Sequence, residues 1–368
     1  MSDGLFRRSI ADIVPYEPGK PVEEVQRELG LARVVKLASN EGPFPPFPAA
    51  VEAVERLSGE LNRYPDGATY TLRAALAELH GVAFEEVVVA AGADAVIDLL
   101  SQATLEPDDE IVCGWPSFPS YVLDAIKLGA VPRRVPLRDH TYDLDGLLAA
   151  IGPRTKLVHV CHPNNPTGTA NGRAELLAFF DRVPEHVLVV LDQAYFEYVD
   201  DSDYADGIAE LFKAGRRLVV LRTFSKIYGL AGLRVGYGIA PADVAAATSK
   251  VRRAFDVSAT AQAAAVASLG DDAELTRRRA ANAVGRAQLE AALREHGLEP
   301  AGPALGNFLF VDVGGGRALF EQLLRQGVVV RPLDAFGAEE AIRVTVGTAD
   351  ENAIFADALG HVLSGVSS

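Results

Sequence analysis

Cysteine is scarce in this sequence, which contains only Cys113 and Cys161 among 368 residues. The two lie far apart and neither belongs to a Cys-x-x-Cys pair, so the sequence indicates neither a disulfide framework nor a zinc site. Each falls at the end of an expected strand, where a cysteine commonly serves as a small buried hydrophobic side chain. We therefore expect no metal centre.

Long apolar runs and an excess of positive charge are also absent. No stretch reaches the length of a membrane-spanning helix, and the opening MSDGLFRRSI has no apolar segment typical of a secretory signal. Lys and Arg total 35 against 50 Asp and Glu, a net charge of -15, which argues against nucleic acid as a partner. The sequence therefore predicts a soluble cytoplasmic protein that binds neither membranes nor nucleic acid.

Lysine is uncommon, and Lys226 stands apart from the others because it follows the short apolar run 218–221, an expected buried strand. A desolvated lysine has a lowered pKa, and its neutral amine can bond to a carbonyl carbon. Ser225, Thr223 and Arg234 lie close enough in sequence to bind one phosphate together. This combination indicates pyridoxal phosphate (PLP), although the same stretch also fits a basic turn with Lys226 in solvent.

Short apolar strands alternate with helices from about residue 87 to residue 221, a pattern typical of a mostly parallel sheet covered on both faces. Beyond residue 240 a long helical stretch, 241–295, precedes three expected strands and a closing helix, 349–363, which predicts a smaller α+β domain. We expect three parts: an N-terminal arm that packs with the small domain or a partner, a large cofactor-binding domain, and a linking helix with the small domain (1–36, 37–240 and 241–368).

Polar residues cluster just after the expected strands of the large domain, where ligands of parallel sheets bind. Gly92-Ala93-Asp94 opens a helix and offers an anion site, or else a plain turn capped by Asp94. Phe118, in a loop with Trp115, can stack on a flat ring or pack in the core. Asn165 lies in HPNNPTG, a loop fixed by two prolines, and can donate to a ring oxygen.

Three further positions carry charges or hydroxyls that suit a ring and an anion. Asp192 and Tyr195 follow the strand 187–191, where a carboxylate can keep a pyridine nitrogen protonated; a helix cap is the simpler alternative for Asp192. Arg343, inside the apolar strand IRVTVGT, indicates a buried anion or an internal ion pair. Arg331 ends another strand and fits a second anion contact as well as it fits a surface ion pair.

Nine strings in one order make the chain resemble the fold-type-I PLP-dependent aminotransferases, in particular the histidinol-phosphate aminotransferase group. The resemblance covers essentially the whole chain and is carried by YEPGKP, KLASNE, RYPDG, GADAVIDLL, NNPTG, LDQAY, TFSKIYGLAGLRVGY, GNFLFVD and IRVTVGT. It implies an α/β fold with a mostly parallel, seven-stranded-type large domain and a smaller α+β domain. It also implies a homodimer whose sites are built from both subunits.

The resemblance implies a role for each of these side chains. Lys226 would hold PLP and move the proton, Asp192 would pair with the pyridine nitrogen, and Asn165 and Tyr195 would contact the ring oxygen. Phe118 would stack on the ring, and the remaining cofactor contacts would bind the phosphate: Ala93, Asp94, Ser225, Arg234 and, from the partner subunit, Tyr64. The expected substrate contacts are Arg343, Arg331, Asn40 and a hydroxyl from Tyr16.

The implied reaction transfers the amino group of L-histidinol phosphate to 2-oxoglutarate, giving imidazole-acetol phosphate and L-glutamate in histidine biosynthesis. Three departures from the family's pattern leave the donor open: Gln193, Gly42 and Asp256 stand where the family has Glu, Asn and Asn. An aromatic (phenylalanine) aminotransferase is the nearest alternative. A PLP-dependent decarboxylase or lyase is a remoter one, which Arg343 disfavours, and a PLP-fold sensor fused to a DNA-binding module has no room in this chain.

Overall fold

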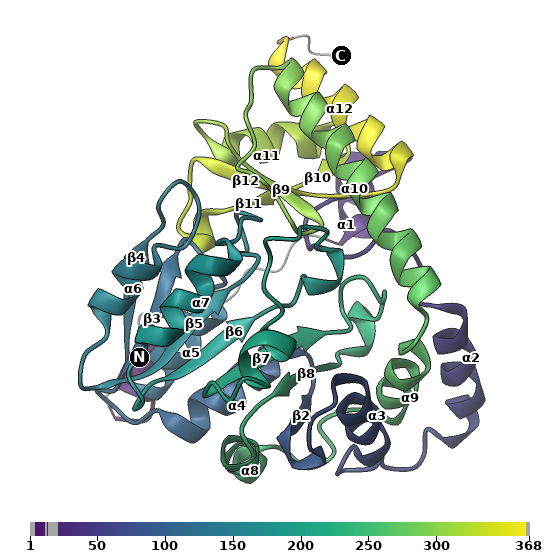
Figure 1. Ribbon diagram of the computed structural model, residues 1–368. Coiled ribbons are helices and arrows are strands. Elements are labelled where there is room, and N and C mark those ends of the chain that lie inside the picture. The colour runs from purple at the N-terminus through teal and green to yellow at the C-terminus, as the bar shows by residue number, and fades with distance from the viewer. Residues whose placement is uncertain (1–3, 12, 14–20, 366–368) are drawn as a thin grey trace.

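The computed structural model describes residues 4–11, 13 and 21–365, and its centre is a seven-stranded sheet (Figure 1). All neighbouring strands in it are parallel except at β8, which is antiparallel to both of its neighbours. The strand order across the sheet is β2 (Val87–Ala90), β8 (Gly236–Ile239), β7 (Leu218–Thr223), β6 (Leu188–Asp192), β5 (Thr155–Cys161), β3 (Glu110–Trp115) and β4 (Val131–Pro136). The predicted α/β class with a mostly parallel sheet is confirmed.

The central strands are short runs of Val, Leu and Ile, and every residue of β6 and β7 is buried. Such continuous apolar runs need cover on both faces, and helices supply it. The helices of this part of the chain are α2 (Pro48–Leu57), α3 (Tyr70–His80), α4 (Ala93–Thr104), α5 (Ser120–Leu128), α6 (Leu144–Ala150), α7 (Arg173–Arg182), α8 (Ala242–Val251) and α9 (Ala259–Ser268).

A three-stranded antiparallel sheet forms the second, smaller unit, in the order β11 (Arg331–Pro332), β12 (Ala341–Thr345) and β9 (Phe308–Asp312). The helices α11 (Gly316–Arg325) and α12 (Ala349–Leu363) pack with it, and α10 (Asp272–Glu295) runs up from α9 to reach them (Figure 1). Close to the N-terminus, α1 (Val22–Leu29) precedes β1 (Val35–Lys36), which pairs with β10 (Val328–Val329). The chain near residue 36 therefore joins the smaller unit.

Three local expectations differ from the structure. The helical stretch expected over 241–295 is three helices, α8, α9 and α10, and the first two contribute Val244, Ala261 and Ala264 to the larger core. The strand expected over 328–331 divides at Val330 into β10 and β11, which pair with different partners. The helix α11 was not expected, because its Gly-rich start, Gly314 to Gly316, hides its amphipathic pattern. The domain boundaries at residues 36 and 240 stay a prediction.

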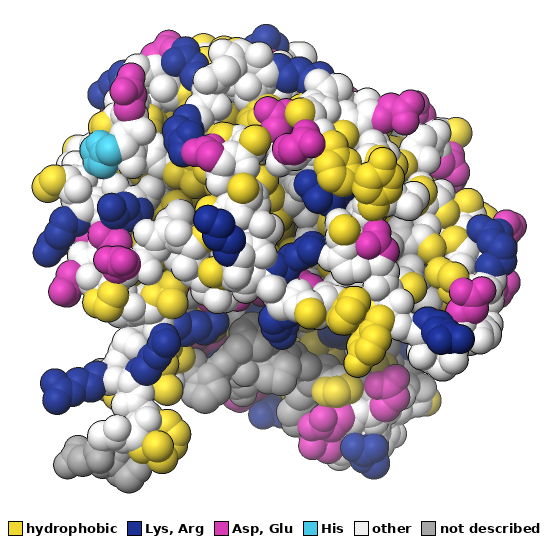
Figure 2. Space-filling view, turned by 90° about the horizontal axis from the view of Figure 1, so that it is seen from below, with side chains coloured by type: hydrophobic (Ala, Val, Ile, Leu, Met, Phe, Trp, Pro, Cys, Tyr) yellow, Lys and Arg dark blue, Asp and Glu magenta, His cyan; other side chains and the backbone are white. Residues whose placement is uncertain are grey.

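The distribution of charged side chains on the surface agrees with the amino-acid composition, in which acidic and basic residues are both frequent. In Figure 2, acidic and basic side chains are interspersed over the visible face, and hydrophobic side chains form small groups among them. Across the residues that the structure describes, no helix combines the length and the apolar character needed to cross a bilayer.

Candidate functional site

A cavity of about 570 Å³ lies where the carboxyl ends of the large sheet face the smaller unit. It brings together side chains that are far apart in the sequence but were all expected to bind cofactor or substrate: Asn40, Ala93, Asp94, Phe118, Asn165, Asp192, Tyr195, Ser225, Lys226, Arg234, Arg331 and Arg343. Tyr64 does not line it, and Tyr16 lies outside the described residues.

Lys226 lies in the turn that follows β7, with a half-buried side chain whose amine is 3.5 Å from the carbonyl oxygen of Ser39. Its pKa is lowered from 10.5 to about 8, chiefly because burial disfavours the charged form, and further by the positive charge of Arg343. A large fraction of this amine is therefore neutral, and nucleophilic, near pH 8. This is the property that the sequence suggested for Lys226.

Asp192 ends β6, with its carboxylate buried at the bottom of the cavity. The hydroxyl of Tyr121 donates to Oδ2 at 2.6 Å, and the backbone N–H of Ala194 donates to Oδ1 at 3.1 Å. Burial raises the pKa of Asp192, while these two hydrogen bonds oppose the rise. A cationic ring nitrogen placed beside this carboxylate would compensate the burial of its charge, as the proposed pairing requires.

The N-terminus of α4 forms one end of the cavity together with Ser225 and Arg234. The guanidinium of Arg234 lies 3.4 Å from Ser225 Oγ. Two glycines keep this end open: a Cβ on Gly92 would lie 2.8 Å from Arg234 Nη2, and one on Gly236 would lie 2.3 Å from the nitrogen of Ala93. Free N–H groups of a first helical turn, a hydroxyl and a guanidinium make an anion site suited to a phosphate.

Amide and aromatic side chains form the wall of the cavity between Asp192 and the anion site. Tyr195 accepts a hydrogen bond from Asn40 Nδ2 at 2.9 Å, and its ring lies 5.5 Å from the Lys226 amine. Burial raises the pKa of Tyr195, so its hydroxyl keeps its proton. Asn165 faces the smaller unit, where its Oδ1 accepts from Arg343, and Phe118 packs edge-on against the ring of Tyr121.

Arg343 and Arg331 are opposite each other on the antiparallel strands β12 and β11. The buried Arg343 also donates to the carbonyl oxygen of Ala38 at 2.8 Å, whereas Arg331 is only half-buried. Both guanidinium groups lie near the ring of Phe336, at 5.4 and 5.8 Å from its centre. The smaller unit thus presents two adjacent cations to the cavity.

Tyr64 lies on the surface of the single chain, 81% exposed, with its ring stacked on Phe255 at 4.5 Å. Within one subunit it is thus separate from the other phosphate contacts. Its predicted role from a partner subunit stays a prediction.

The cavity fits PLP group by group. It offers an anion site for the phosphate, a carboxylate for the pyridine nitrogen, a hydroxyl and an amide for the ring oxygen, and a lysine amine with a lowered pKa for the aldehyde. The two glycines whose Cβ atoms would obstruct the anion site are the most specific part of this fit.

Comparison with known proteins agrees with this geometry. The family model for aminotransferase class I and II matches residues 32–359. The chain belongs to the class I and II aminotransferases. It is 46% identical to the histidinol-phosphate aminotransferase of Moorella thermoacetica over 97% of this chain and 93% of that protein, and 46% identical to that of Akkermansia muciniphila over 98% and 99%.

Solved structures of this aminotransferase family show the same fold. The structure of histidinol-phosphate aminotransferase from Sinorhizobium meliloti in complex with pyridoxal-5'-phosphate superposes with a TM-score of 0.88 at 28% identity, covering 99% of both chains. Aspartate aminotransferase from Thermus thermophilus with maleate superposes with a TM-score of 0.82 at 26% identity, covering 94% of this chain and 97% of that one. The resemblance read from the sequence is confirmed at the level of family and fold.

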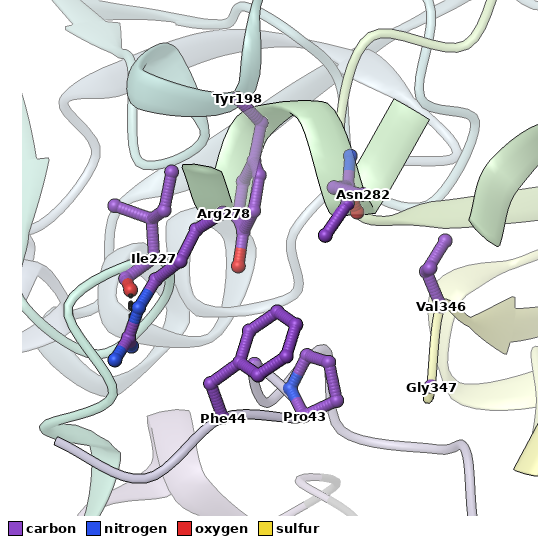
Figure 3. A pocket seen from close by; sticks show the side chains of 10 residues that line it. Pro43, Phe44, Tyr198, Ile227, Arg278, Asn282, Val346 and Gly347 are labelled. Carbon is purple, nitrogen blue, oxygen red and sulfur yellow. Dashed lines mark hydrogen bonds between the residues drawn. The ribbon is translucent and has the colours of Figure 1, made fainter. Parts of the chain in front are cut away.

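Gly42, one of the departures of this aminotransferase from the family's pattern, lines a cavity of about 20 Å³ beside the Lys226 turn (Figure 3). A Cβ at this position would lie 3.1 Å from the carbonyl oxygen of Lys226 and 3.4 Å from the hydroxyl of Tyr198. The absent side chain therefore lets the loop that begins at Asn40 approach the backbone of Lys226.

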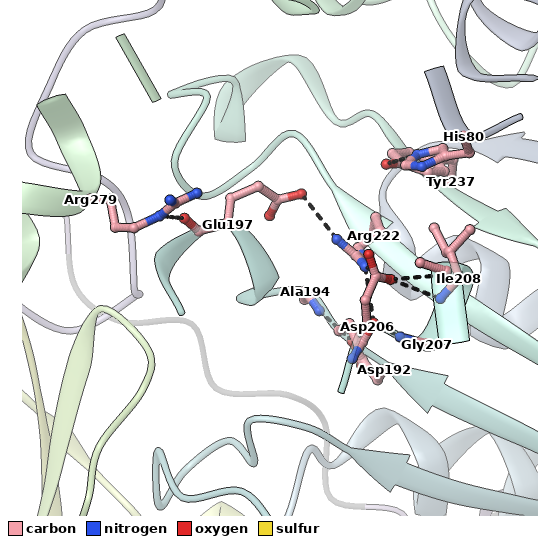
Figure 4. Close-up of polar contacts among 12 residues, drawn as sticks. His80, Asp192, Ala194, Glu197, Asp206, Gly207, Ile208, Arg222, Tyr237 and Arg279 are labelled. Carbon is pink, nitrogen blue, oxygen red and sulfur yellow. Dashed lines mark hydrogen bonds and ion pairs between the residues drawn. The ribbon is translucent and has the colours of Figure 1, made fainter. Parts of the chain in front are cut away.

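Gln193 is buried behind Asp192 and does not line the main cavity. Its amide nitrogen donates to Ala205, and its Oε1 accepts from Arg222 at 3.0 Å. The charge of Arg222 is already balanced by Asp206 at 3.0 Å and Glu197 at 3.7 Å, two of the contacts drawn in Figure 4. A neutral amide suits a site where a third carboxylate would be unbalanced.

Asp256, the third departure, supports the phosphate end of the cavity indirectly. One carboxylate oxygen accepts from the N–H of Ala91, immediately before Gly92, and the other accepts from Arg253. Asp256 thus fixes the loop that presents the N-terminus of α4.

Two aromatic residues of the site were missed from the sequence. Tyr121 donates to Asp192, and its ring stacks at 4.5 Å on His159, whose pKa burial lowers to about 3, so that the imidazole is neutral. Phe336 lies near both arginines of the smaller unit. Only the spacing Phe118-x-x-Tyr121, which puts both rings beside the sheet, hinted at the first.

Proposed function

We propose that this chain is a histidinol-phosphate aminotransferase, which uses PLP to transfer the amino group of L-histidinol phosphate to 2-oxoglutarate. The observation that carries the proposal is the pair Arg331 and Arg343 in the same cavity as the lowered-pKa Lys226. The names of the relatives with 46% identity, and the PLP bound in the Sinorhizobium meliloti structure, support it.

Each group of residues in the cavity has a proposed task in binding PLP. PLP, when bound, supplies a conjugated ring that withdraws electrons from the reacting carbon. Asp192 holds a proton on the ring nitrogen, Tyr195 and Asn165 orient the ring through its oxygen, and Phe118 covers one face. Ala93, Asp94, Ser225 and Arg234 bind the phosphate, and this binding fixes the distance between ring and base.

Lys226 is the proposed covalent anchor and the base of the reaction. Its amine, which is mostly neutral at a pH above about 8, would remove the proton from Cα of the amino donor and deliver it to the carbon on the cofactor side. 2-Oxoglutarate then binds in the same cavity and accepts the amino group, which completes a ping-pong cycle.

The donor is distinguished at the two arginines. Histidinol phosphate carries a phosphate ester where an amino acid carries its α-carboxylate, so its anion lies further from Cα and holds more charge. Arg343, fixed by Asn165 and Ala38, supplies the contact that a carboxylate needs, and the half-buried Arg331 beside it supplies the second contact for a phosphate. Tyr16 and Asn40 remain proposed contacts of the same substrate.

Arg331→Ala is therefore expected to lower kcat/KM for histidinol phosphate about tenfold to hundredfold more than for phenylalanine, since a lost charge-assisted hydrogen bond costs about 1.5–3 kcal/mol. Steady-state kinetics with both donors measures this ratio. Arg325→Ala, which removes an exposed arginine of α11, is the control and should leave the ratio unchanged. Equal losses on both donors, or a wild-type preference for phenylalanine, would favour the aromatic aminotransferase instead.

We also propose a homodimer in which Tyr64 reaches the phosphate of the partner subunit. The exposure of Tyr64 and Phe255, with Leu61 and Tyr70 nearby in sequence, supports a surface that a second copy covers.

The two free, buried cysteines support the proposed cytoplasmic location, where thiols stay reduced.

Subunit mixing tests the role of Tyr64. Inactive Tyr64→Ala and Lys226→Ala homodimers are expected to regain activity after exchange, because one site of the heterodimer then contains neither substitution. Mixing Asp192→Ala with Lys226→Ala is the control: both residues act within one subunit, each site keeps one lesion, and no activity should return. If exchange is shown by native mass spectrometry and the Tyr64 mixture stays inactive, Tyr64 acts within its own chain.

A further inference from the structure

Arg278, on the helix α10, is buried and hydrogen-bonded on three sides. Its side chain is 4% exposed, and its Nε donates to Glu274 of the same helix at 2.7 Å. Nη1 donates to the carbonyl oxygen of Ile227 at 2.9 Å (Figure 3). Nη2 donates to the carbonyl oxygen of Pro45 at 2.7 Å. A planar guanidinium can hold two carbonyl groups at fixed positions, which a lysine amine on a flexible stem does less well.

The two carbonyl groups belong to the two segments that meet at the reactive amine. Ile227 directly follows Lys226, and Pro45 lies in the loop that begins at Asn40. The segments touch through glycines: a Cβ on Gly229 would lie 3.1 Å from the Pro45 oxygen, just as one on Gly42 would lie 3.1 Å from the Lys226 oxygen. Arg278 thus holds a junction where backbone packs directly on backbone.

One turn further along α10, Asn282 donates to the carbonyl oxygen of Gly306, just before β9. β9 pairs with β12, where Arg343 lies opposite Phe310. The same buried face of α10 therefore contacts both the Lys226 turn and the sheet that carries the substrate arginine. Arg278 itself does not line the main cavity, so a substitution there removes none of the groups that line it.

We propose that Arg278 is a positioning residue for catalysis, which clamps the Lys226 turn against the loop 40–47 and thereby keeps the Lys226 amine in place and shielded from water. The proposal rests on the role assigned to Lys226 under the proposed function. Shielding matters because burial is the main cause of the lowered pKa of this lysine, so a loosened clamp returns the pKa toward 10.5.

Arg278→Lys and Arg278→Met test the clamp, with Arg277→Met as the matched control. Arg277 is the neighbouring arginine, also bonded to Glu274 and also over the ring of Phe44, but it is 52% exposed, and within the described part of the chain its hydrogen bonds reach only Glu274. We expect kcat of the PLP-loaded enzyme to fall about tenfold to hundredfold in both Arg278 variants, with KM for the amino donor within about threefold. The control should match the wild type.

A second readout does not depend on turnover. In the full-length chain without added PLP, the reaction of Lys226 with acetic anhydride, followed by mass spectrometry of its peptide across pH, gives the pH midpoint of the amine. We expect about 8 in the wild type and in Arg277→Met, and a clearly higher midpoint in both Arg278 variants. Lys250, an exposed lysine of α8, serves as the internal reference.

The outcomes separate this proposal from the proposed function. Unchanged kcat and midpoint in Arg278→Lys would overturn the clamp, and so would a lower kcat with an unchanged midpoint. Thermal melting identifies a variant that does not fold. If only Arg278→Met is unfolded, the result with Arg278→Lys decides for or against the clamp. If both variants are unfolded, Arg278 has a purely structural role and the clamp is overturned. If the wild type fails to bind PLP at Lys226, the proposed function falls, while the midpoints still test the clamp.

Discussion

Lys226→Ala is expected to reduce turnover by at least about 10⁴-fold, the upper range that a single general base contributes. The reason is that Lys226 has two proposed tasks in the cavity, covalent attachment of PLP and proton transfer at Cα, and among the described residues no second lysine is placed to take them over. Of the cavity-lining residues, only Lys127 is another lysine, and its amine is bonded to Asp124 at 2.7 Å. Single-turnover assays measure the loss.

Borohydride reduction of the PLP-loaded protein, followed by peptide mapping, should find the cofactor on the peptide that contains Lys226. Lys127→Ala is the matched variant and should keep that label. The rate of PLP attachment to the cofactor-free protein should rise with pH through a midpoint near 8, because the amine reacts only when neutral. A label on another lysine would show that the anchor is wrongly assigned.

Asp192→Ala is expected to reduce turnover by several orders of magnitude while leaving PLP bound. The carboxylate keeps the pyridine nitrogen protonated, and without it the ring loses most of its capacity to withdraw electrons. Binding should survive because the phosphate contacts at α4, Ser225 and Arg234 remain. Turnover and the visible absorbance of the loaded protein measure the two effects separately.

A graded companion strengthens this test. Tyr121→Phe removes the 2.6 Å hydrogen bond to Asp192 but leaves the carboxylate, so we expect a loss of only about tenfold. Near-normal turnover in Asp192→Ala would remove Asp192 from the mechanism. A Tyr121→Phe variant as impaired as Asp192→Ala would mean that the hydroxyl, and not the carboxylate, is the decisive group.

The large sheet could be predicted from the sequence because its strands are short apolar runs between turn residues. The functional side chains of a parallel sheet lie at the carboxyl ends of its strands. Asp192 and Lys226 each follow such a run directly, so their position at the cavity could be inferred locally. The strand β8 is not such a run, because two glycines and a tyrosine precede Ile239, and its antiparallel direction depends on the turn through Arg234.

Contacts between distant segments could not be inferred in this way. Tyr121 and Asp192 are 71 residues apart, and Arg278 and Pro45 are 233 apart. The first depends on how α5 packs on the large sheet and the second on how α10 meets the loop 40–47, and a local pattern of hydrophobic residues specifies neither. The pairing of Arg331 with Arg343 likewise depends on the register of β11 against β12. For Tyr64, the decisive neighbour is proposed to be a second copy of the chain.

The most direct test of the proposed function is a single-turnover reaction of the PLP-loaded enzyme with separate amino donors, followed by the visible absorbance of the bound cofactor. We predict that this absorbance is lost with a higher second-order rate constant with L-histidinol phosphate than with phenylalanine. We also predict that 2-oxoglutarate restores it. A faster discharge by phenylalanine, or no recovery with 2-oxoglutarate, would contradict the proposed function.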